Sequence, residues 1–311
     1  MISWRYHLIS IVAVFLALGL GVLAGTTVLN DNLVRNLKDR TTTLEGYLSD
    51  TRKSVDELRT QIGTANAFAD QAMPYIVGSK LANEDVVVVT EDGVDGRALA
   101  ETRKALDLAG ARVLTTLTVH PLLAAGTSSA QQDLAALLGM PQDATPEELG
   151  AAAAQTLAER LAKDPRTAPV GQTDPLGELL SQGFVTASGP GLSDSTLQGI
   201  GGRGQVVVAI GGGGAALSPS SSAFLVPLVD DLVSLGVVTG AGESAASDDG
   251  FISDVRGASN DSGHPLVTVD NADMPIGSSA MVLGLQSVLF GGPGGDYGIK
   301  ADASRLLPPP A

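Results

Sequence analysis

The first thirty residues contain an uncharged apolar segment that is long enough to span a lipid bilayer. It runs from Leu8 to Leu29 and reads LISIVAVFLALGLGVLAGTTVL. About 20 apolar residues cross the hydrocarbon core as a helix, and Trp4 and Tyr6 lie where interfacial aromatic side chains anchor such a helix. The segment therefore predicts a single transmembrane anchor over residues 1–29, with the rest of the chain outside the cytoplasm.

A cleavable signal peptide is the alternative interpretation of this segment. Arg5 supplies a positive charge before the apolar run, and Val22-Leu23-Ala24 resembles a cleavage site. The run is long for a signal peptide and helical sequence follows it directly, which favours an uncleaved anchor. Either interpretation sends the rest of the chain across the membrane. The short N-terminal tail favours a cytoplasmic amino terminus, so we expect a single-pass protein of the plasma membrane.

Two glycines in the apolar run have the spacing of a helix-packing motif. Gly21 and Gly25 form a GxxxG pattern, and glycines so placed let two membrane helices approach closely. Glycine is common in this chain, with 38 residues, so composition alone accounts for the pattern equally well. Both interpretations stay open at this point.

Beyond the anchor, apolar residues recur at alternating steps of three and four, which is the heptad spacing of a coiled coil. The stripe consists of Val34, Leu37, Thr41, Leu44, Leu48, Thr51, Val55, Leu58, Ile62, Ala65 and Ala69. Met73-Pro74 is expected to end this helix, so we predict a coiled coil over residues 30–73. It pairs with itself or with a partner helix; packing of the helix on the chain's own globular domain is the alternative. The predicted oligomerisation residues are Gly21, Gly25, Val34, Leu37, Leu44, Leu48, Val55, Leu58 and Ile62.

The part of the chain after the coiled coil is strongly acidic. Residues 81–311 contain 27 Asp or Glu and 11 Lys or Arg, a net charge of −16. Phosphate contacts need clustered Lys or Arg, so this charge argues against a nucleic-acid partner. The chain has no cysteine, which excludes disulfides, cysteine nucleophiles and thiolate metal sites.

Residues 81–311 alternate between strand and helix patterns, which predicts an extracytoplasmic α/β domain. Val86–Thr90 is a continuous apolar run, as in a strand buried on both faces. Further strands are predicted at Arg112–Val119, Gln205–Ile210, Val237–Thr239 and Leu266–Val269, and helices at about Arg97–Ala109, Ala223–Leu235 and Ser278–Phe290. This rhythm predicts a mostly parallel, Rossmann-like sheet with helices on both faces.

Residues 128–183 have a helical pattern and are predicted to form an insertion within this domain. The expected helices are Gln131–Leu138, Pro146–Leu161 and Leu176–Ser181, and Pro146 before two glutamates is a good helix start. The polar, glycine-rich segment Ala241–Ser262 is predicted to be a loop. Gly291–Gly295 and the Pro308–Pro310 tail are predicted to be irregular.

The sequence contains no strong catalytic or metal-binding motif. The run Gly211–Gly214 follows a strand, but no GxGxxG opens a helix and no P-loop lysine follows, so a flexible loop is favoured over a nucleotide site. There is no GxSxG motif, and Ser220–Ser222 lie where hydroxyls commonly cap a helix. His120 and His264 each precede a proline and are expected to be turn residues. Asp248, Asp249, Asp254 and Asp261 are expected to form a solvated acidic loop rather than a cation site.

Several segments of the chain resemble the actinobacterial MctB family. They are the opening MISWRYHLISIVAVFLALGLGVLAG, the coiled coil directly after it, VVVVTEDGVDG, and the late FGGPGGDYGIKADASRLLP. Members are known as copper transport proteins, and some as outer-membrane proteins. The resemblance therefore implies an envelope protein with a role in copper efflux or homeostasis. Some relatives are instead associated with cell division and control of cell-wall hydrolases, as SteB-type proteins.

Two hypotheses about function follow. By resemblance, the chain is a copper-handling envelope protein; copper is implied by the resemblance only, and no copper-ligand motif is carried onto particular residues. By architecture, it is a non-catalytic scaffold or regulator that contacts an envelope protein through its coiled coil. An enzyme is not expected, because no nucleophile–base pair or cofactor fingerprint stands out.

Overall fold

The computed structural model describes residues 4–120, 128–164, 174–189, 193, 197, 199–202, 204–212, 221–248, 250–259 and 263–309. The chain divides into two compact parts, Met1–Ala65 and Asn66–Ala311. Residues 26–33 are helical, and their side chains are not described.

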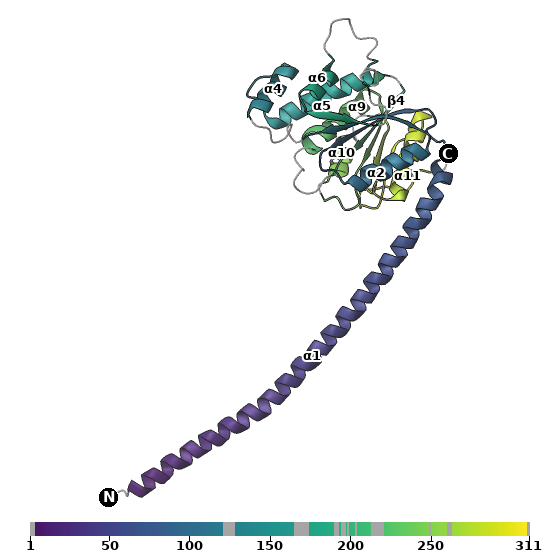
Figure 1. The fold of residues 1–311 in the computed structure, drawn as a ribbon. Coiled ribbons are helices and arrows are strands. Elements are labelled where there is room, and N and C mark those ends of the chain that lie inside the picture. The colour runs from purple at the N-terminus through teal and green to yellow at the C-terminus, as the bar shows by residue number, and fades with distance from the viewer. Residues whose placement is uncertain are drawn as a thin grey trace. The chain divides into compact units, whose positions relative to one another are not determined.

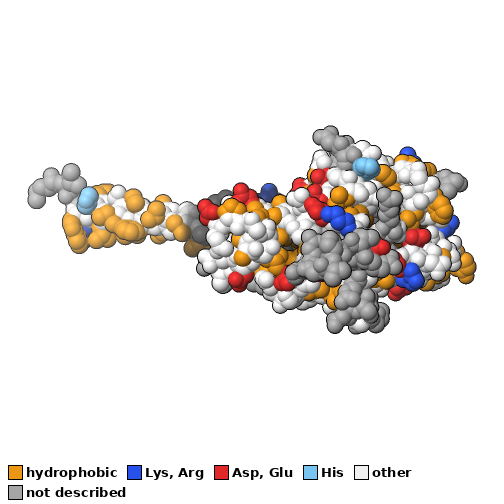
Figure 2. Space-filling model, turned by 90° about the horizontal axis from the view of Figure 1, so that it is seen from above, with side chains coloured by type: hydrophobic (Ala, Val, Ile, Leu, Met, Phe, Trp, Pro, Cys, Tyr) orange, Lys and Arg blue, Asp and Glu red, His pale blue; other side chains and the backbone are white. Residues whose placement is uncertain are grey.

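The first part consists of the long helix α1, Trp4–Val77, whose last turns belong to the second part. The stretch Trp4–Gly25 is a 22-residue helical segment that, by length and composition, is able to cross a membrane. Figure 2 shows hydrophobic side chains covering the N-terminal end of α1. Among the described residues no other helix passes the same test, so the structure agrees with a single N-terminal anchor.

The prediction that Met73-Pro74 ends the helix is wrong by one turn. Helix α1 contains Pro74 and continues to Val77, and the carbonyl of Pro74 accepts a hydrogen bond from the Gly78 N–H at 3.1 Å. Met73 and Val77 are fully buried in the core of the second part. Their burial outweighs the hydrogen bond that proline cannot donate, which is a case of tertiary packing overriding local propensity.

The second part is built on a seven-stranded sheet in the order β3-β2-β1-β4-β5-β6-β7. All neighbouring strands are parallel except β2 and β3, which are antiparallel. The strands are β1 Asp85–Glu91, β2 Arg112–Val119, β3 Val185–Ser188, β4 Gln205–Ile210, β5 Val238–Gly242, β6 Leu266–Val269 and β7 Gly295–Tyr297. The predicted mostly parallel α/β sheet is confirmed.

Helices cover both faces of this sheet, as predicted. On one face are the end of α1, α2 and α11; on the other are α4, α5, α6, the π-helical turn η2, α9 and α10 (Figure 1). Their bounds are α2 Gly96–Leu108, α4 Ser128–Leu138, α5 Pro146–Ala162, α6 Pro175–Ser181, η2 Ser221–Leu225, α9 Val226–Ser234, α10 Phe251–Ser259 and α11 Pro275–Leu289. Strand alternation explains the two cores, since Val86 and Val88 face one and Val87 and Val89 the other.

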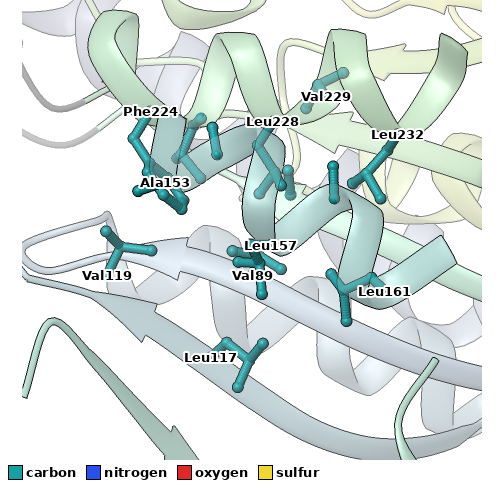
Figure 3. Close-up of a cluster of buried hydrophobic side chains, with 14 of the residues drawn as sticks. Val89, Leu117, Val119, Ala153, Leu157, Leu161, Phe224, Leu228, Val229 and Leu232 are labelled. Carbon is teal, nitrogen blue, oxygen red and sulfur yellow. The ribbon is translucent and has the colours of Figure 1, made fainter. Parts of the chain in front are cut away.

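Helix α5 lies at the centre of the larger core. Its buried residues include Ala153, Leu157 and Leu161, which pack between strands β1 and β2 and helix α9 (Figure 3). The predicted helices of residues 128–183 are present as α4, α5 and α6. Their apolar side chains share one core with the sheet.

Three elements were not predicted from the sequence. The segment Ala241–Ser262 contains the end of β5 and helix α10, so the predicted loop is wrong there; Phe251, Ile252 and Val255 are buried and hold α10 on the sheet. Strands β3 and β7 have four and three residues. Such short strands carry too little periodicity to be seen in the sequence, and pairing with β2 and β6 defines them.

Helix α5 begins with a capping box, which gives a testable prediction. The Thr145 hydroxyl accepts from the Glu148 N–H at 3.2 Å, and the Glu148 carboxylate accepts from the Thr145 N–H at 2.8 Å. We expect Thr145→Ala to lower the free energy of unfolding by about 1 kcal/mol, because it leaves helix N–H groups unsatisfied. Urea unfolding followed by pulse proteolysis measures this, with Thr145→Ser, which keeps the hydroxyl, as the control. Equal losses in both variants would contradict the capping role.

Candidate functional site

The predicted oligomerisation residues beyond the anchor all project from α1 into solvent. Exposed fractions range from 39% at Val55 to 61% at Leu44. The core of the second part uses Met73 and Val77 from α1, and neither belongs to the predicted stripe. The stripe is therefore a mostly apolar surface, interrupted by Thr41 and Thr51, that the described chain leaves uncovered, which is unusual for a water-exposed helix. Its large apolar members are Val34, Leu37, Leu44, Leu48, Val55, Leu58 and Ile62.

Gly21 and Gly25 lie on a different side of α1 from the start of this stripe. Nine residues separate Gly25 from Val34, which corresponds to about two and a half turns of α-helix. No heavy atom lies within 4 Å of a Cβ built on either glycine, so their surface is open to close approach. The helix thus presents the glycine pair and the heptad stripe on opposite faces.

A second candidate region lies at the C-terminal ends of the parallel strands, here called the carboxyl edge of the sheet. The strand order reverses at β1, which has β2 on one side and β4 on the other. Ligands of open α/β sheets bind at the carboxyl ends of the strands beside such a reversal point. Three acidic residues lie at the ends of parallel strands here: Glu91 ends β1, Glu243 follows β5 and Asp270 follows β6. All are at most 2% exposed. A buried carboxylate is costly unless it is paired or hydrogen-bonded, so their partners decide what this edge can bind.

Gly211 and Gly212, the two glycines of the Gly211–Gly214 run that the structure describes, are in contact with other residues of the chain. The Gly212 N–H donates to the Glu91 carboxylate at 3.1 Å. A Cβ on Gly211 would lie 2.7 Å from the ring of Phe251, so only glycine fits beneath that ring. The amide that a phosphate would need at this turn thus faces a carboxylate. Gly213 and Gly214 lie outside the described residues.

Arg256 of α10 is the centre of a buried ion-pair network. Its guanidinium lies 3.1 Å from Asp270 and 2.9 Å from Asp302, and it donates to the Tyr297 carbonyl at 3.0 Å and to the Thr268 hydroxyl at 2.9 Å. Asp270 is fully buried and also accepts from the Ile299 N–H at 2.7 Å. The network therefore ties α10 and β6 to the segment that follows β7.

This C-terminal segment also places a lysine on the carboxyl edge. Lys300 Nζ donates to Glu243 at 2.7 Å and to the Ser247 carbonyl at 2.6 Å. Close approach of the segment is possible because residue 298 is glycine, whose φ is +139° and whose Cβ position would overlap the Asp270 carboxylate. The edge is thus filled by the chain's own cation and backbone between β5 and β7.

The ion pair of Asp302 predicts a specific pH dependence of stability. Partial burial by itself raises the pKa of Asp302, but the hydrogen bond and charge of Arg256 outweigh it and lower the pKa below the ordinary value. A depressed pKa contributes stability that is present above the unfolded-state value of about 4 and is lost as pH falls through the folded-state pKa. We therefore expect wild type to lose more stability than Asp302→Asn between about pH 5 and pH 2.

Acid titration of urea midpoints on the full chain measures this difference. In an Arg256→Ala background, Asp302→Asn should change the pH slope much less, because Arg256 makes the largest contribution to lowering the Asp302 pKa and Lys300 adds a smaller one. An undiminished slope difference without Arg256 would show that another group causes it.

His120 lies at the other end of the same edge, between strand ends β1 and β3. Its Nδ1 is 3.5 Å from the Asp92 carboxylate and its Nε2 is 3.0 Å from the Thr186 hydroxyl. The imidazole is partly exposed and the carboxylate more so. The structure thus brings His120 together with two polar groups that the sequence did not pair with it.

The remaining sequence candidates lie apart from these groups. His264, Asp248 and Asp254 are exposed; Asp249, Asp261, Ser220 and the side chains of Ser221 and Ser222 lie outside what the structure describes. Over the described ranges, no group of three or more His, Asp or Glu side chains is arranged to hold a metal ion.

Sequence reasoning missed the residues that organise the carboxyl edge. Arg256 and Glu243 lie in the segment predicted to be a loop, and Asp270 directly follows a correctly predicted strand. The available signal was Asp270 itself, since a carboxylate at the end of a buried parallel strand marks this edge. Lys300 lies in the late segment that carries the family resemblance, but no spacing rule connects it with Glu243.

Comparison with known proteins covers the whole length of the chain. The family model described as copper transport outer membrane protein, MctB, matches residues 1–308. The copper transporter MctB of Mycobacterium tuberculosis (strain ATCC 25618 / H37Rv) is 25% identical over 316 residues, which cover 96% of each chain. The copper transporter MctB of Mycobacterium leprae (strain TN) is 26% identical over 324 residues, covering 99% of this chain and all of that protein. The range that the family model matches includes α1 and the α/β part.

Proposed function

This chain belongs to the MctB family of copper transport proteins, and from that membership we propose that it is a membrane-anchored cell-envelope protein that takes part in copper efflux or homeostasis. The observation that supports the proposal is the match of the family over residues 1–308, anchor included. Copper is the cargo in this proposal, and no residue of the chain is assigned as its ligand.

The proposed location is the plasma membrane, with one uncleaved N-terminal helix and the α/β domain outside the cytoplasm. The 22-residue apolar helix supports the anchor, and the family description adds an association with the outer membrane. Separation of inner and outer membranes followed by N-terminal sequencing of the full chain tests both the location and the absence of cleavage.

In this proposal the α/β domain is a non-catalytic, Rossmann-like domain that follows a coiled coil. The strand order β3-β2-β1-β4-β5-β6-β7 supports a Rossmann-like domain, because the first six strands follow the doubly wound order. The Glu91 contact to the Gly212 N–H disfavours a bound phosphate at that turn. The exposed stripe of α1 supports the coiled coil.

Loss of the gene in the source organism tests the copper role. We expect greater copper accumulation and greater copper sensitivity, both reversed by the full chain and not by a chain lacking residues 4–25. Copper titration of the full chain in detergent, with His120→Ala and His264→Ala as variants, tests direct binding by Cu(I) and Cu(II). Unchanged copper content and tolerance in the deletion strain would contradict the proposal.

A second candidate function is a scaffold or regulator of cell-wall hydrolysis and cell division. The specific observation in its favour is the uncovered apolar stripe, because an exposed apolar surface of this kind suits protein binding better than transport. Under this candidate, deletion impairs separation of daughter cells at ordinary copper levels, and a cross-linker recovers an envelope partner that depends on Leu44 and Leu58. Normal separation would argue against it.

A further inference from the structure

We infer that the α1 stripe from Val34 to Ile62 pairs with the same stripe of a second copy of this chain, in parallel and in register. This inference rests on the proposed function, from which it takes the single membrane anchor. It identifies the binding partner of the coiled coil as a second copy of the same chain. An isolated helix gains little stability beyond its propensity in water. The Val34–Ile62 stretch contains Gly46 and exposed Val and Leu side chains, so burial of the stripe supplies stability that the described chain lacks.

Charges beside the stripe favour an identical partner in register. With Val34 at heptad position a and Leu37 at d, Arg40 occupies position g and Glu45 occupies position e of the following heptad. In a parallel pair, each g residue faces the e residue of the next heptad on the other helix. Arg40 therefore faces the partner's Glu45, and symmetry makes this attractive contact twice.

The same charges disfavour the two neighbouring registers. A slip of one heptad in either direction places Arg40 opposite the partner's Lys38 or the partner's Arg52. Like charges at these positions destabilise a coiled coil. The remaining g residues of the in-register pair are Tyr47, Ser54 and Gln61. The first two face arginines and Gln61 faces the partner's Asn66, so none of them creates a like-charge contact.

Of the two polar residues in the stripe, Thr41 and Thr51, the first is compatible with burial. Its hydroxyl donates to the Leu37 carbonyl of the same helix at 2.8 Å. Because this hydrogen bond lies within one helix, Thr41 can be enclosed between two helices without leaving its donor unsatisfied.

The membrane anchor selects the parallel orientation. Residues 34–62 form about 42 Å of helix at 1.5 Å per residue. Two antiparallel copies would place their apolar Trp4–Gly25 segments at opposite ends of this length, which one bilayer does not accommodate. Parallel copies place both segments in the same membrane.

The glycine pair is not part of this seam. Gly25 lies about two and a half turns before Val34, on the opposite face of α1. A pair closed through the stripe therefore turns Gly21 and Gly25 outward. Gly25→Leu is accordingly expected to leave the pairing unchanged.

Single cysteines test the orientation and register directly. The chain contains no cysteine, so Leu44→Cys, Leu58→Cys and, as a matched control at outward position f, Lys53→Cys each report on one site. The full chain, purified alone and reconstituted into phospholipid vesicles, is oxidised with diamide and separated on a non-reducing gel. We expect a cross-linked dimer from both Leu44→Cys and Leu58→Cys, several-fold above the Lys53→Cys control. Cross-linking at one of the two positions alone shows an antiparallel pair, and control-level cross-linking at both shows a shifted pair or no pair; either result overturns the inference.

Charge reversal tests the register. Arg40→Glu is expected to weaken pairing on the order of 5-fold, measured by energy transfer between labelled chains at increasing dilution in lipid. Combining Arg40→Glu with Glu45→Arg should restore it, and Lys53→Glu, which reverses an outward charge, should have no effect. An equal loss from Arg40→Glu and Lys53→Glu, or no restoration in the double variant, overturns the register.

These results separate the inference from the proposed function. Cross-linking at both positions with unchanged copper tolerance in the deletion strain would keep the pairing and reject the copper role. Absence of cross-linking in a chain that restores copper tolerance would reject the pairing and keep the copper role.

Discussion

Replacing Arg256 with alanine is expected to lower the free energy of unfolding of the α/β domain by about 3–5 kcal/mol, because it leaves a buried carboxylate without its cation. Arg256 and Asp270 are 7% and 0% exposed and lie 3.1 Å apart. Removal of Arg256 also removes the donors to Thr268 and to the Tyr297 carbonyl. Arg256→Lys keeps a charge without the planar fork, so we expect an intermediate loss.

The measurement is pulse proteolysis of the full chain in urea and detergent. Fluorescence does not report this domain, because the single tryptophan is Trp4 in the apolar helix. The matched control is Arg112→Ala, which breaks an Arg–Asp pair at the opposite edge of the same sheet with an arginine that is 64% exposed. An exposed pair contributes about 0–1 kcal/mol. Similar losses in the two alanine variants would show that the buried network is not what stabilises the domain.

A double replacement distinguishes the attraction between Arg256 and Asp270 from the free-energy cost of burying their charges. Arg256→Met combined with Asp270→Leu removes both charges, so no unpaired charge remains buried. We expect this double variant to be more stable than Arg256→Ala alone. Amide hydrogen exchange at Ile299 and Lys300, which donate to Asp270 at 2.7 and 3.2 Å, should increase in both. Unchanged exchange there would mean that other contacts hold the C-terminal segment.

The sheet was predictable from the sequence wherever a strand is long and buried. Val86–Thr90 and Gln205–Ile210 are apolar at every or nearly every position because helices cover both faces, and both are central strands. Pro146 and the glutamates after it predicted the start of α5 for a reason that the structure shows, the Thr145–Glu148 capping box. These signals are local, and so a single sequence contains them.

The parts that escaped prediction depend on residues distant in the chain. Strand β3 pairs with β2 about 70 residues earlier, and Phe251 of α10 packs against Gly211, 40 residues earlier. The Arg256 network joins residues that are 12 to 46 positions apart. Periodicity and spacing rules apply only to residues close in the chain. They therefore predicted the α1 stripe but not the contacts at the carboxyl edge.

Replacing Leu157 with alanine is expected to lower the free energy of unfolding by about 2–5 kcal/mol, because it opens a cavity in the centre of the larger core. Leu157 is fully buried on α5 and lies against Val89 of β1, with Leu228 of α9 on the far side of the helix (Figure 3). Since α5 is packed on two sides, collapse of either layer onto the cavity is restricted. The loss should therefore lie in the upper half of this range.

Two variants control for the loss at Leu157. Leu157→Met conserves volume and should cost less than about 1.5 kcal/mol. Leu235→Ala, at the end of α9 where the side chain is 47% exposed, removes the same atoms without a closed cavity and should cost far less. A loss at Leu157 no larger than at Leu235 would mean that α5 is a peripheral addition to the sheet. The expected large difference would instead mean that residues 128–183, although inserted between strands in the sequence, supply part of the core on which the sheet depends.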